Sequence, residues 1–203
     1  CPGLVAGDSL ASYCLTEPGA GSDAAALRTR ADRDGDVYRV NGSKVFISGA
    51  GDTDVLMVMT RTGDAGSKGI TALLIPADAA GVNYGKKEHK MGWTAQPTRM
   101  ITFDDVEVPI SHRLGEEGQG FAIAMEGLDG GRINIATCSV GTAQQALEDA
   151  QAYVSDRKQF GQAIADFQNT QFKLADMVTE LVAARQMIRL AASKLDAGDS
   201  QAS

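Results

Sequence analysis

Residues 27–48, LRTRADRDGDVYRVNGSKVFIS, decide the fold class of this chain. Asp34-Gly35 stands between two segments in which apolar and polar residues alternate, and Asp-Gly is a strong signal for a hairpin turn. Asn41-Gly42 stands in a similar context and predicts a second hairpin. Because the alternation has the period of a β-strand, we expect consecutive antiparallel strands here.

Further strands are expected on the C-terminal side of this stretch. The segments VLMVMTR (55–61) and GITALLIP (69–76) are short apolar runs rich in β-formers, and turn residues separate them. The segment TRMITFDDVEVP (98–109) completes the set. Short strands at close spacing, with no helical period between them, predict an antiparallel β-barrel or sandwich.

The hydrophobic period changes near residue 115. Residues 121–157 carry apolar side chains at helical spacing, and residues 166–195 do so again after a break at Gln159-Phe160-Gly161. We therefore expect an α+β chain, with a β domain over residues 1–115 and long helices of a partial helical bundle over residues 116–203. The apolar stripe expected on the second helix consists of Phe172, Leu174, Ala175, Met177, Val178, Leu181 and Val182.

Composition excludes several classes of function. The 203 residues carry a formal charge of −7, which argues against nonspecific nucleic-acid binding. No apolar run has the length that spans a bilayer, so we expect no membrane partner. The cysteines, Cys1, Cys14 and Cys138, are too scattered for a disulfide framework and indicate a reducing compartment. His89 and His112 stand apart from other ligand types, so we expect no metal.

The run YCLTEPGAGSD (13–23) combines hydroxyl groups with a glycine-rich turn. Its hydroxyl groups belong to Tyr13, Thr16 and Ser22. Pro18 fixes its own φ, while Gly19 and Gly21 allow the backbone to approach a ligand closely. This chemistry suits a planar heterocycle that carries a diphosphate.

The same run has two other interpretations. Residues 19–24 fit the pattern G-x-G-x-x-A, the dinucleotide fingerprint, which needs a preceding apolar strand and a following long helix. Pro18 directly before the first glycine and the early turn at Asp34-Gly35 contradict that context. A surface turn without a ligand explains Gly-Ala-Gly alone, but not the whole run in this order.

Four motifs in this order resemble those of the acyl-CoA dehydrogenase family. They are YCLTEPGAGSD (13–23), NGSKVFISG (41–49), GLDGGR (127–132) and DRKQFG (156–161). The resemblance extends over nearly the whole chain and implies the middle β domain plus about half of the C-terminal four-helix domain. It implies FAD as cofactor, an acyl-CoA as substrate and electron-transferring flavoprotein as electron acceptor. Since both ends look cut, we expect a fragment of a longer enzyme that assembles as a homotetramer, a dimer of dimers.

The resemblance also implies residues that contact the cofactor. They are Tyr13, Leu15, Thr16, Gly21, Ser22, Phe46, Ile47, Ser48, Arg157, Phe160 and Gln168. Ser48 would donate a hydrogen bond near the flavin N5, and Phe46 would cover one face of the ring; otherwise Phe46 belongs to the core and Ser48 begins a turn. Arg157, Phe160 and Gln168 would contact the FAD of a neighbouring subunit, unless this segment is only a solvated connection between helices.

The substrate contacts implied by the resemblance lie in three places. They are Ser22, Lys68, Asp129, Gly130, Gly131 and Arg132, with Ser67 beside Lys68 in a loop that could reach the CoA phosphates. A pair of glycines inside a helix costs roughly 0.8–1 kcal/mol for each residue, so Gly130 and Gly131 indicate a close ligand. The alternatives are a helix kink, a tight helix crossing and, for Lys68, a solvated side chain.

The chain offers no credible catalytic base. Gly131 stands where one branch of the family carries the catalytic glutamate, and glycine cannot accept a proton. Glu17 and Glu126 lie near the motifs, but nothing in the sequence singles them out. We therefore expect the base C-terminal to Ser203.

The expected function is an FAD-dependent α,β-dehydrogenation of a short branched-chain acyl-CoA. The segments SYCLTEPGAGSDAA, WTAQPTRMITF and GLDGGRINIATCS are most similar to the branch of the family that acts on isobutyryl-CoA in valine breakdown. The alternatives are an acyl-CoA oxidase or a flavin-dependent monooxygenase on the same scaffold, and a noncatalytic module. The resemblance fits a bacterial cytoplasm or a mitochondrial matrix.

Overall fold

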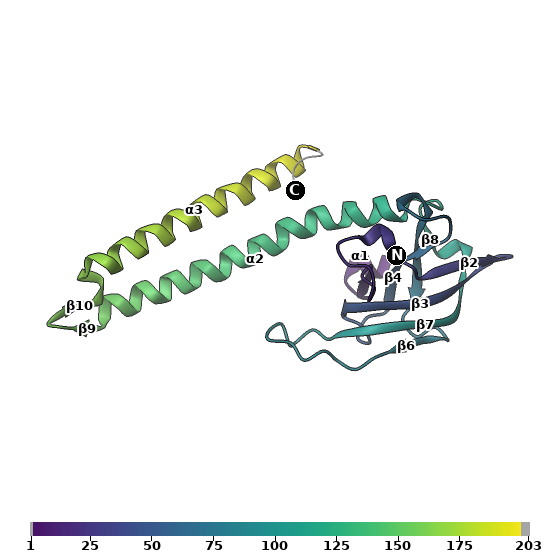
Figure 1. Ribbon diagram of the computed structural model, residues 1–203, viewed down its shortest axis with the longest axis horizontal. Helices are drawn as coiled ribbons and strands as arrows, with labels where there is room; N and C mark the ends of the chain where they lie inside the picture. The colour runs from purple at the N-terminus through teal and green to yellow at the C-terminus, as the bar shows by residue number, and fades with distance from the viewer. Residues whose placement is uncertain (1, 200–203) are drawn as a thin grey trace. The chain divides into compact units, whose positions relative to one another are not determined.

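The computed structural model describes residues 2–199, which divide into two compact units between Met125 and Glu126. The first unit contains a short N-terminal helix, α1 (Pro2–Ala6), a β-sheet and the first turns of helix α2 (Figure 1). The second contains the rest of α2 and helix α3. This order of a sheet of mostly antiparallel strands and then long helices confirms the predicted α+β class.

Within the described residues the first unit contains one eight-stranded sheet. Its strands are β1 (Ala11–Cys14), β2 (Arg30–Asp34), β3 (Val37–Ser48), β4 (Val55–Arg61), β5 (Ile70–Pro76), β6 (Val82–Tyr84), β7 (Thr98–Pro109) and β8 (Arg113–Leu114). They pair in the order β6-β7-β3-β2-β4-β5-β8, and β1 pairs with β4. Short 3₁₀ turns connect them at η1 (Ala24–Ala26), η2 (Ser67–Gly69) and η3 (Ile110–His112).

The inward faces of these strands form one apolar core. Alternate residues of the two longest strands, such as Tyr38 and Val40 on β3 and Val106 and Val108 on β7, are almost fully buried. This period-2 alternation is the pattern from which β2 and β3 were predicted, and β4, β5 and β7 match the other expected strand segments. The hairpin at Asp34-Gly35 is confirmed, since β2 and β3 pair directly across it.

The second predicted hairpin is wrong. Strand β3 continues through Asn41-Gly42 without turning, and Gly42 instead lies opposite a bulge where β7 carries an extra residue. The Asn41 side chain accepts a hydrogen bond from the Asp105 N–H of that bulge at 2.8 Å. Gly42 has a φ of 146°, and a Cβ atom there would lie 2.7 Å from the Thr29 Cα. The glycine therefore serves a bulge and a close backbone approach rather than a turn.

Strand β1 includes the first two residues of the hydroxyl-rich run, Tyr13 and Cys14, and was not predicted. It pairs with β4 in parallel, with Ala11 opposite Val55 and Cys14 opposite Val58. Its residues ASYC do not alternate between apolar and polar types, so no strand period marks this segment. The run that was expected to contact a ligand is thus attached to the sheet by its first residues.

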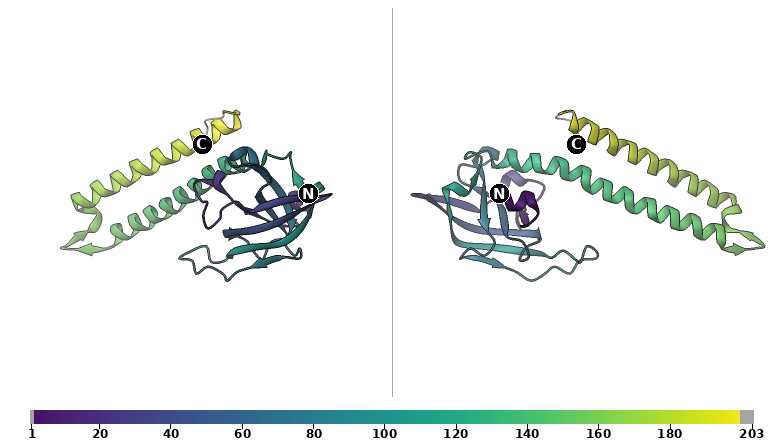
Figure 2. Two further views of the ribbon diagram at one scale, coloured as in Figure 1. Left: turned by 45° about the vertical axis from the view of Figure 1, so that its right-hand side comes forward. Right: turned by 180° about the vertical axis from the view of Figure 1, so that it is seen from behind.

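The helices agree closely with the prediction. Helix α2 (Gly120–Asp156) continues through the Gly130-Gly131 pair, and α3 (Gln168–Asp196) follows a small connection. That connection consists of β9 (Lys158–Gln159), β10 (Gln162–Ala163) and η4 (Ile164–Asp166). In both views of Figure 2, α3 runs back alongside α2. Among the described residues, no helix combines the length and the apolar character that a membrane span requires.

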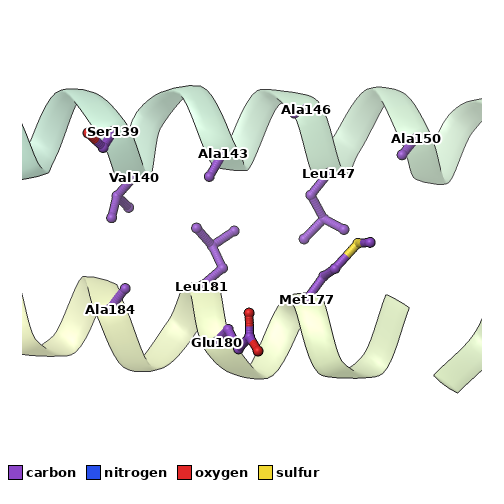
Figure 3. A pocket seen from close by; sticks show the side chains of 10 residues that line it. All are labelled: Ser139, Val140, Ala143, Ala146, Leu147, Ala150, Met177, Glu180, Leu181 and Ala184. Carbon is purple, nitrogen blue, oxygen red and sulfur yellow. The ribbon is translucent and has the colours of Figure 1, made fainter. Parts of the chain in front are cut away.

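The facing sides of α2 and α3 leave an open apolar groove of about 570 Å³. From α2, Val140, Ala143 and Leu147 point toward Met177 and Leu181 of α3 (Figure 3). Leu147 on α2 and Leu181 on α3 are buried, but four large residues of the stripe predicted on α3 remain exposed: Phe172, Met177, Val178 and Val182. Two helices alone therefore cover only part of the apolar face that a bundle would bury.

We expect the Gly42→Ala substitution to destabilise the first unit by about 1–3 kcal/mol, because the new methyl group meets the Thr29 backbone at a φ that disfavours side chains. Urea denaturation followed by circular dichroism measures this loss. Gly19→Ala is the matched control, since nothing lies within 4 Å of its Cβ position. Equal stability of the two variants would contradict the packing role of Gly42.

Candidate functional site

Two of the predicted motifs lie side by side at one edge of the first unit. The Ser12 hydroxyl donates to the Ser48 carbonyl oxygen at 2.8 Å, and the Val45 N–H donates to the Thr16 carbonyl oxygen at 2.9 Å. These bonds hold the end of β1 and the residues after it against the end of β3. Residues 13–16 and 46–48, predicted separately as cofactor contacts, therefore form one surface, which we call the cradle together with the turn at residues 17–22.

Phe46 is turned out of the sheet by a second bulge. Here β3 carries the extra residue between Lys44 and Ile47, and Phe46 takes a φ of 57°. As a result Lys44 and Ile47 both point into the core, while the Phe46 side chain is 67% exposed. Left-handed backbone at a non-glycine residue costs about 1–3 kcal/mol, so the fold holds this aromatic ring in solvent against a local strain.

A buried ion pair fastens the turn of the cradle. The Lys44 Nζ lies 2.8 Å from Glu17 Oε1, with side-chain exposures of 0% and 7%. Lys44 also donates to the Leu15 carbonyl oxygen at 3.0 Å. The Glu17 carboxylate further accepts the backbone N–H groups of Arg28 and Thr29, at 2.6 and 2.9 Å. The Glu17 carboxylate thus joins the start of the loop between β1 and β2 to the end of that loop at Arg28 and Thr29.

Glu17 and Lys44 each stabilise the charged form of the other. Burial would raise the pKa of Glu17, but the Lys44 ammonium and the hydrogen bonds that Glu17 accepts outweigh it and hold that pKa below its ordinary value. Burial lowers the pKa of Lys44, and Glu17 opposes that effect. Beside them, burial raises the pKa of the Cys14 thiol to about 12, so Cys14 stays neutral. Since Glu17 is ion-paired and buried, the structure gives it a structural role.

The turn itself is open to a ligand. Glu17 and Ala20 exchange two backbone hydrogen bonds, at 3.0 and 3.2 Å, around Pro18 and Gly19. No atom lies within 4 Å of the Cβ positions of Gly19 and Gly21. Ser22, the next residue, is exposed. The backbone here can therefore be approached closely, as the glycines suggested.

Other predicted contacts have their side chains occupied inside the protein. The Tyr13 hydroxyl donates to the Ala124 carbonyl oxygen in α2 at 2.9 Å, and burial raises the Tyr13 pKa to about 12. The side chains of Leu15 and Ile47 lie in the core. At these two positions only the backbone can reach a ligand, whereas Thr16, Phe46 and Ser48 retain partly or fully exposed side chains.

Lys68, the remaining predicted residue of the first unit, is exposed in the turn η2. Its loop is closed by the N–H groups of Thr62 and Gly63, which both donate to the Gly69 carbonyl oxygen. Gly69 is essential to this closure, because a Cβ atom there would lie 2.0 Å from the Asp64 carbonyl oxygen.

The other predicted residues belong to the second unit. Residues 129–132 lie on α2, and the Cβ positions of Gly130 and Gly131 have no atom within 4 Å, so the described chain makes no tight helix crossing there. Arg157 follows the end of α2 and Gln168 begins α3. Between them Phe160, at a φ of 54°, is 96% exposed, and its ring contacts Phe167 edge-on with centroids 6.3 Å apart.

Two residues that shape the site were missed by sequence reasoning. Lys44 occupies an inward position of β3, and a lysine in the inward register of a strand is a usable sign of a buried partner. Arg61 ends β4 and donates side-chain hydrogen bonds to the loops on both sides. Nothing in the sequence near Arg61 marks that role.

Comparison with known proteins identifies the family. The family model for the acyl-CoA dehydrogenase middle domain matches residues 12–106, and the model for the acyl-CoA dehydrogenase C-terminal domain matches residues 118–203. The chain belongs to the acyl-CoA dehydrogenase family. Members of this family are FAD-dependent oxidoreductases, and the predicted resemblance is confirmed.

Individual relatives agree with this assignment. The chain is 56% identical over 202 residues to mitochondrial isobutyryl-CoA dehydrogenase of Dictyostelium discoideum, covering 99% of this chain and 49% of that protein. It is 53% identical over 195 residues to the Bos taurus protein of the same name, covering 96% and 47%. The solved butyryl-CoA dehydrogenase of Megasphaera elsdenii superposes with a TM-score of 0.94 at 44% identity, covering 98% and 53%. The chain thus spans about half the length of these relatives.

The cradle fits the cofactor of the family. A flavin offers a planar ring to an exposed aromatic side chain, and Phe46 is such a side chain. Ser48 is exposed two residues further on, where it can donate a hydrogen bond to a heteroatom of the ring. The open turn at Gly19 and Gly21 leaves room for the ligand at the backbone.

We expect Lys44→Met to destabilise the protein by about 3–5 kcal/mol, because it leaves the Glu17 carboxylate buried without its cation. Adding Glu17→Gln to this variant should recover part of the loss, since the buried charge is then gone. Urea denaturation of both single variants and the double variant gives the coupling free energy.

Arg30→Met serves as the control for this cycle. It breaks an ion pair with Asp32 whose side chains are 60% and 62% exposed, so solvent screens the pair and we expect a much smaller loss than for Lys44→Met. If Lys44→Met proved as mild as Arg30→Met, the buried pair would not fasten the cradle.

Proposed function

We propose that this chain is the flavin-binding and first helical part of an FAD-dependent acyl-CoA dehydrogenase that oxidises a short branched-chain acyl-CoA, such as isobutyryl-CoA, to the enoyl-CoA. The observation that carries the proposal is the cradle, where the run after β1 and the outward Phe46 at the end of β3 lie side by side. The identity to two proteins named isobutyryl-CoA dehydrogenase supports the choice of acyl group.

Each part of the cradle has a role in this proposal. Phe46 would cover one face of the flavin, Ser48 would donate a hydrogen bond to the ring, and the backbone near Thr16 and Gly21 would bind the remaining polar edge. When bound, FAD supplies the acceptor for the hydride that leaves the β-carbon of the acyl group. Packing of these groups around the ring would exclude water from the reacting carbons, which strengthens the hydrogen bonds to the thioester carbonyl.

The residues of the second unit have proposed roles as well. Asp129 and Arg132 would contact the CoA part of the substrate, and the small Gly130-Gly131 pair would leave space for it on α2. Arg157, Phe160 and Gln168 would contact the FAD of a neighbouring subunit in a homotetramer. The exposed ring of Phe160 and the open groove between α2 and α3 support an assembly that covers them.

The base that removes the α-proton is proposed to lie outside this chain. Gly131 has no proton acceptor, and Glu17 is buried in its ion pair. Electron-transferring flavoprotein would reoxidise the cofactor, in a mitochondrial matrix or a bacterial cytoplasm. These are the partner and the compartments that the family resemblance implies.

Anaerobic addition of isobutyryl-CoA to the purified complete protein tests the proposal. We expect loss of the oxidised flavin absorbance and formation of the enoyl-CoA, with butyryl-CoA and isovaleryl-CoA as competing substrates. Rapid consumption of oxygen when air is admitted would favour the acyl-CoA oxidase or monooxygenase alternative. A stable, colourless protein would favour the noncatalytic module and refute the proposal.

We expect Phe46→Ala to weaken flavin retention about tenfold, because a stacked aromatic contact of roughly 1–1.5 kcal/mol is lost. Since the side chain is exposed, the stability of the flavin-free protein should change by less than about 0.5 kcal/mol. Equilibrium dialysis against FAD measures the first effect and urea denaturation the second.

Trp93→Ala is the control for this substitution. Trp93 is also an exposed aromatic residue with a positive φ, 55°, but it lies outside the cradle. Equal flavin affinity in the Phe46→Ala variant and the unaltered protein would place the ring of Phe46 away from the cofactor.

A further inference from the structure

Arg61 connects two loops through a single guanidinium group. From the end of β4, its Nε donates to the Leu27 carbonyl oxygen at 3.0 Å and its Nη2 to the Ala25 carbonyl oxygen at 2.7 Å. On the other side its Nη1 donates to the carbonyl oxygens of Asp64 and Gly66, at 2.5 and 3.0 Å. Four backbone carbonyl groups from two separate loops therefore share one side chain.

These two loops are the ones that carry the predicted substrate residues of the first unit. Ala25 and Leu27 follow Ser22 in the loop between β1 and β2, and the loop bonded through Asp64 and Gly66 leads directly into Ser67 and Lys68. Between the two loops lies a pocket of about 340 Å³, lined by residues of both loops and by Arg61 itself. Thus the relative position of the two loops depends on the contacts of Arg61.

The charge of Arg61 is not neutralised by these contacts. Its side-chain acceptors are carbonyl oxygens, and within residues 2–199 it forms no ion pair. A guanidinium group is always protonated at the pH of the cell. The positive charge of Arg61 therefore adds to that of the exposed Lys68 in attracting a polyanion such as the phosphates of CoA.

We propose that Arg61 is a positioning residue that holds the Ser22 loop and the Lys68 loop in the arrangement that receives the nucleotide end of a CoA thioester. This inference rests on the proposed function, and it concerns binding of the CoA part rather than the oxidation of the acyl group. Lysine cannot replace the fork of the guanidinium, because a single ammonium cannot reach carbonyl oxygens on both sides.

The test compares two thioesters of the same acid in the purified complete protein. Isobutyryl-CoA carries the nucleotide, whereas the isobutyryl thioester of N-acetylcysteamine lacks it and all phosphates. For Arg61→Met we expect KM for isobutyryl-CoA to rise about tenfold or more, with kcat nearly unchanged. The kcat/KM of the truncated thioester and the flavin content should stay within about twofold of the unaltered protein.

Two further variants make the result decisive. Arg61→Lys retains the charge but loses the fork, and we expect a smaller rise of KM that is again confined to isobutyryl-CoA. Arg33→Met removes the same charge from the exposed hairpin, where Arg33 donates to the Gly35 carbonyl oxygen, and should leave both substrates unaffected.

Each other outcome has a definite meaning. An equal effect of Arg61→Met on both thioesters, or no effect on either, would overturn the proposal, as would failure of both Arg61 variants to fold. An unaltered protein that binds flavin but oxidises neither thioester would refute the proposed function instead.

Discussion

The cradle depends on the buried ion pair between Glu17 and Lys44. Without the ammonium of Lys44, the carboxylate of Glu17 would lie in the protein interior with only two backbone N–H groups to solvate it. With it, the Glu17 carboxylate joins the residues after β1 to Arg28 and Thr29, just before β2, and its ion pair with Lys44 attaches it to β3. Because an unpaired charge in this place is costly, the ion pair opposes any movement that separates the loop from β3.

Much of the fold could be predicted because the signals were local. The alternation in β2 and β3, the apolar runs of β4 and β5 and the helical period of α2 and α3 each reside in one continuous stretch. The hairpin predicted at Asn41-Gly42 was wrong because this dipeptide occurs both in turns and beside bulges. Only the pairing with the partner strand, β7, distinguishes the two cases. Strand β1 was missed for a related reason, since its parallel partner β4 lies far along the chain and its own residues do not alternate.

The residues of the candidate site were likewise predictable only where the signal was local in the sequence. The motif residues were found because their residue types are unusual in sequence, as with the hydroxyls and glycines of the run 13–23. Lys44 and Arg61 were missed because their roles come from atoms that approach only in the folded chain, a carboxylate for one and four carbonyl groups for the other. Sequence patterns thus identified groups that face a ligand better than groups that hold them in place.

The bulge at Phe46 has a consequence for how such a protein can change over time. The extra residue removes this side chain from the core register while Lys44 and Ile47 on either side remain inside. The side chain at position 46 can therefore be replaced while the strand around it keeps its position in the sheet. Mutation can vary its size or polarity, and with it the chemistry presented to a ligand, without repacking the apolar core of the sheet.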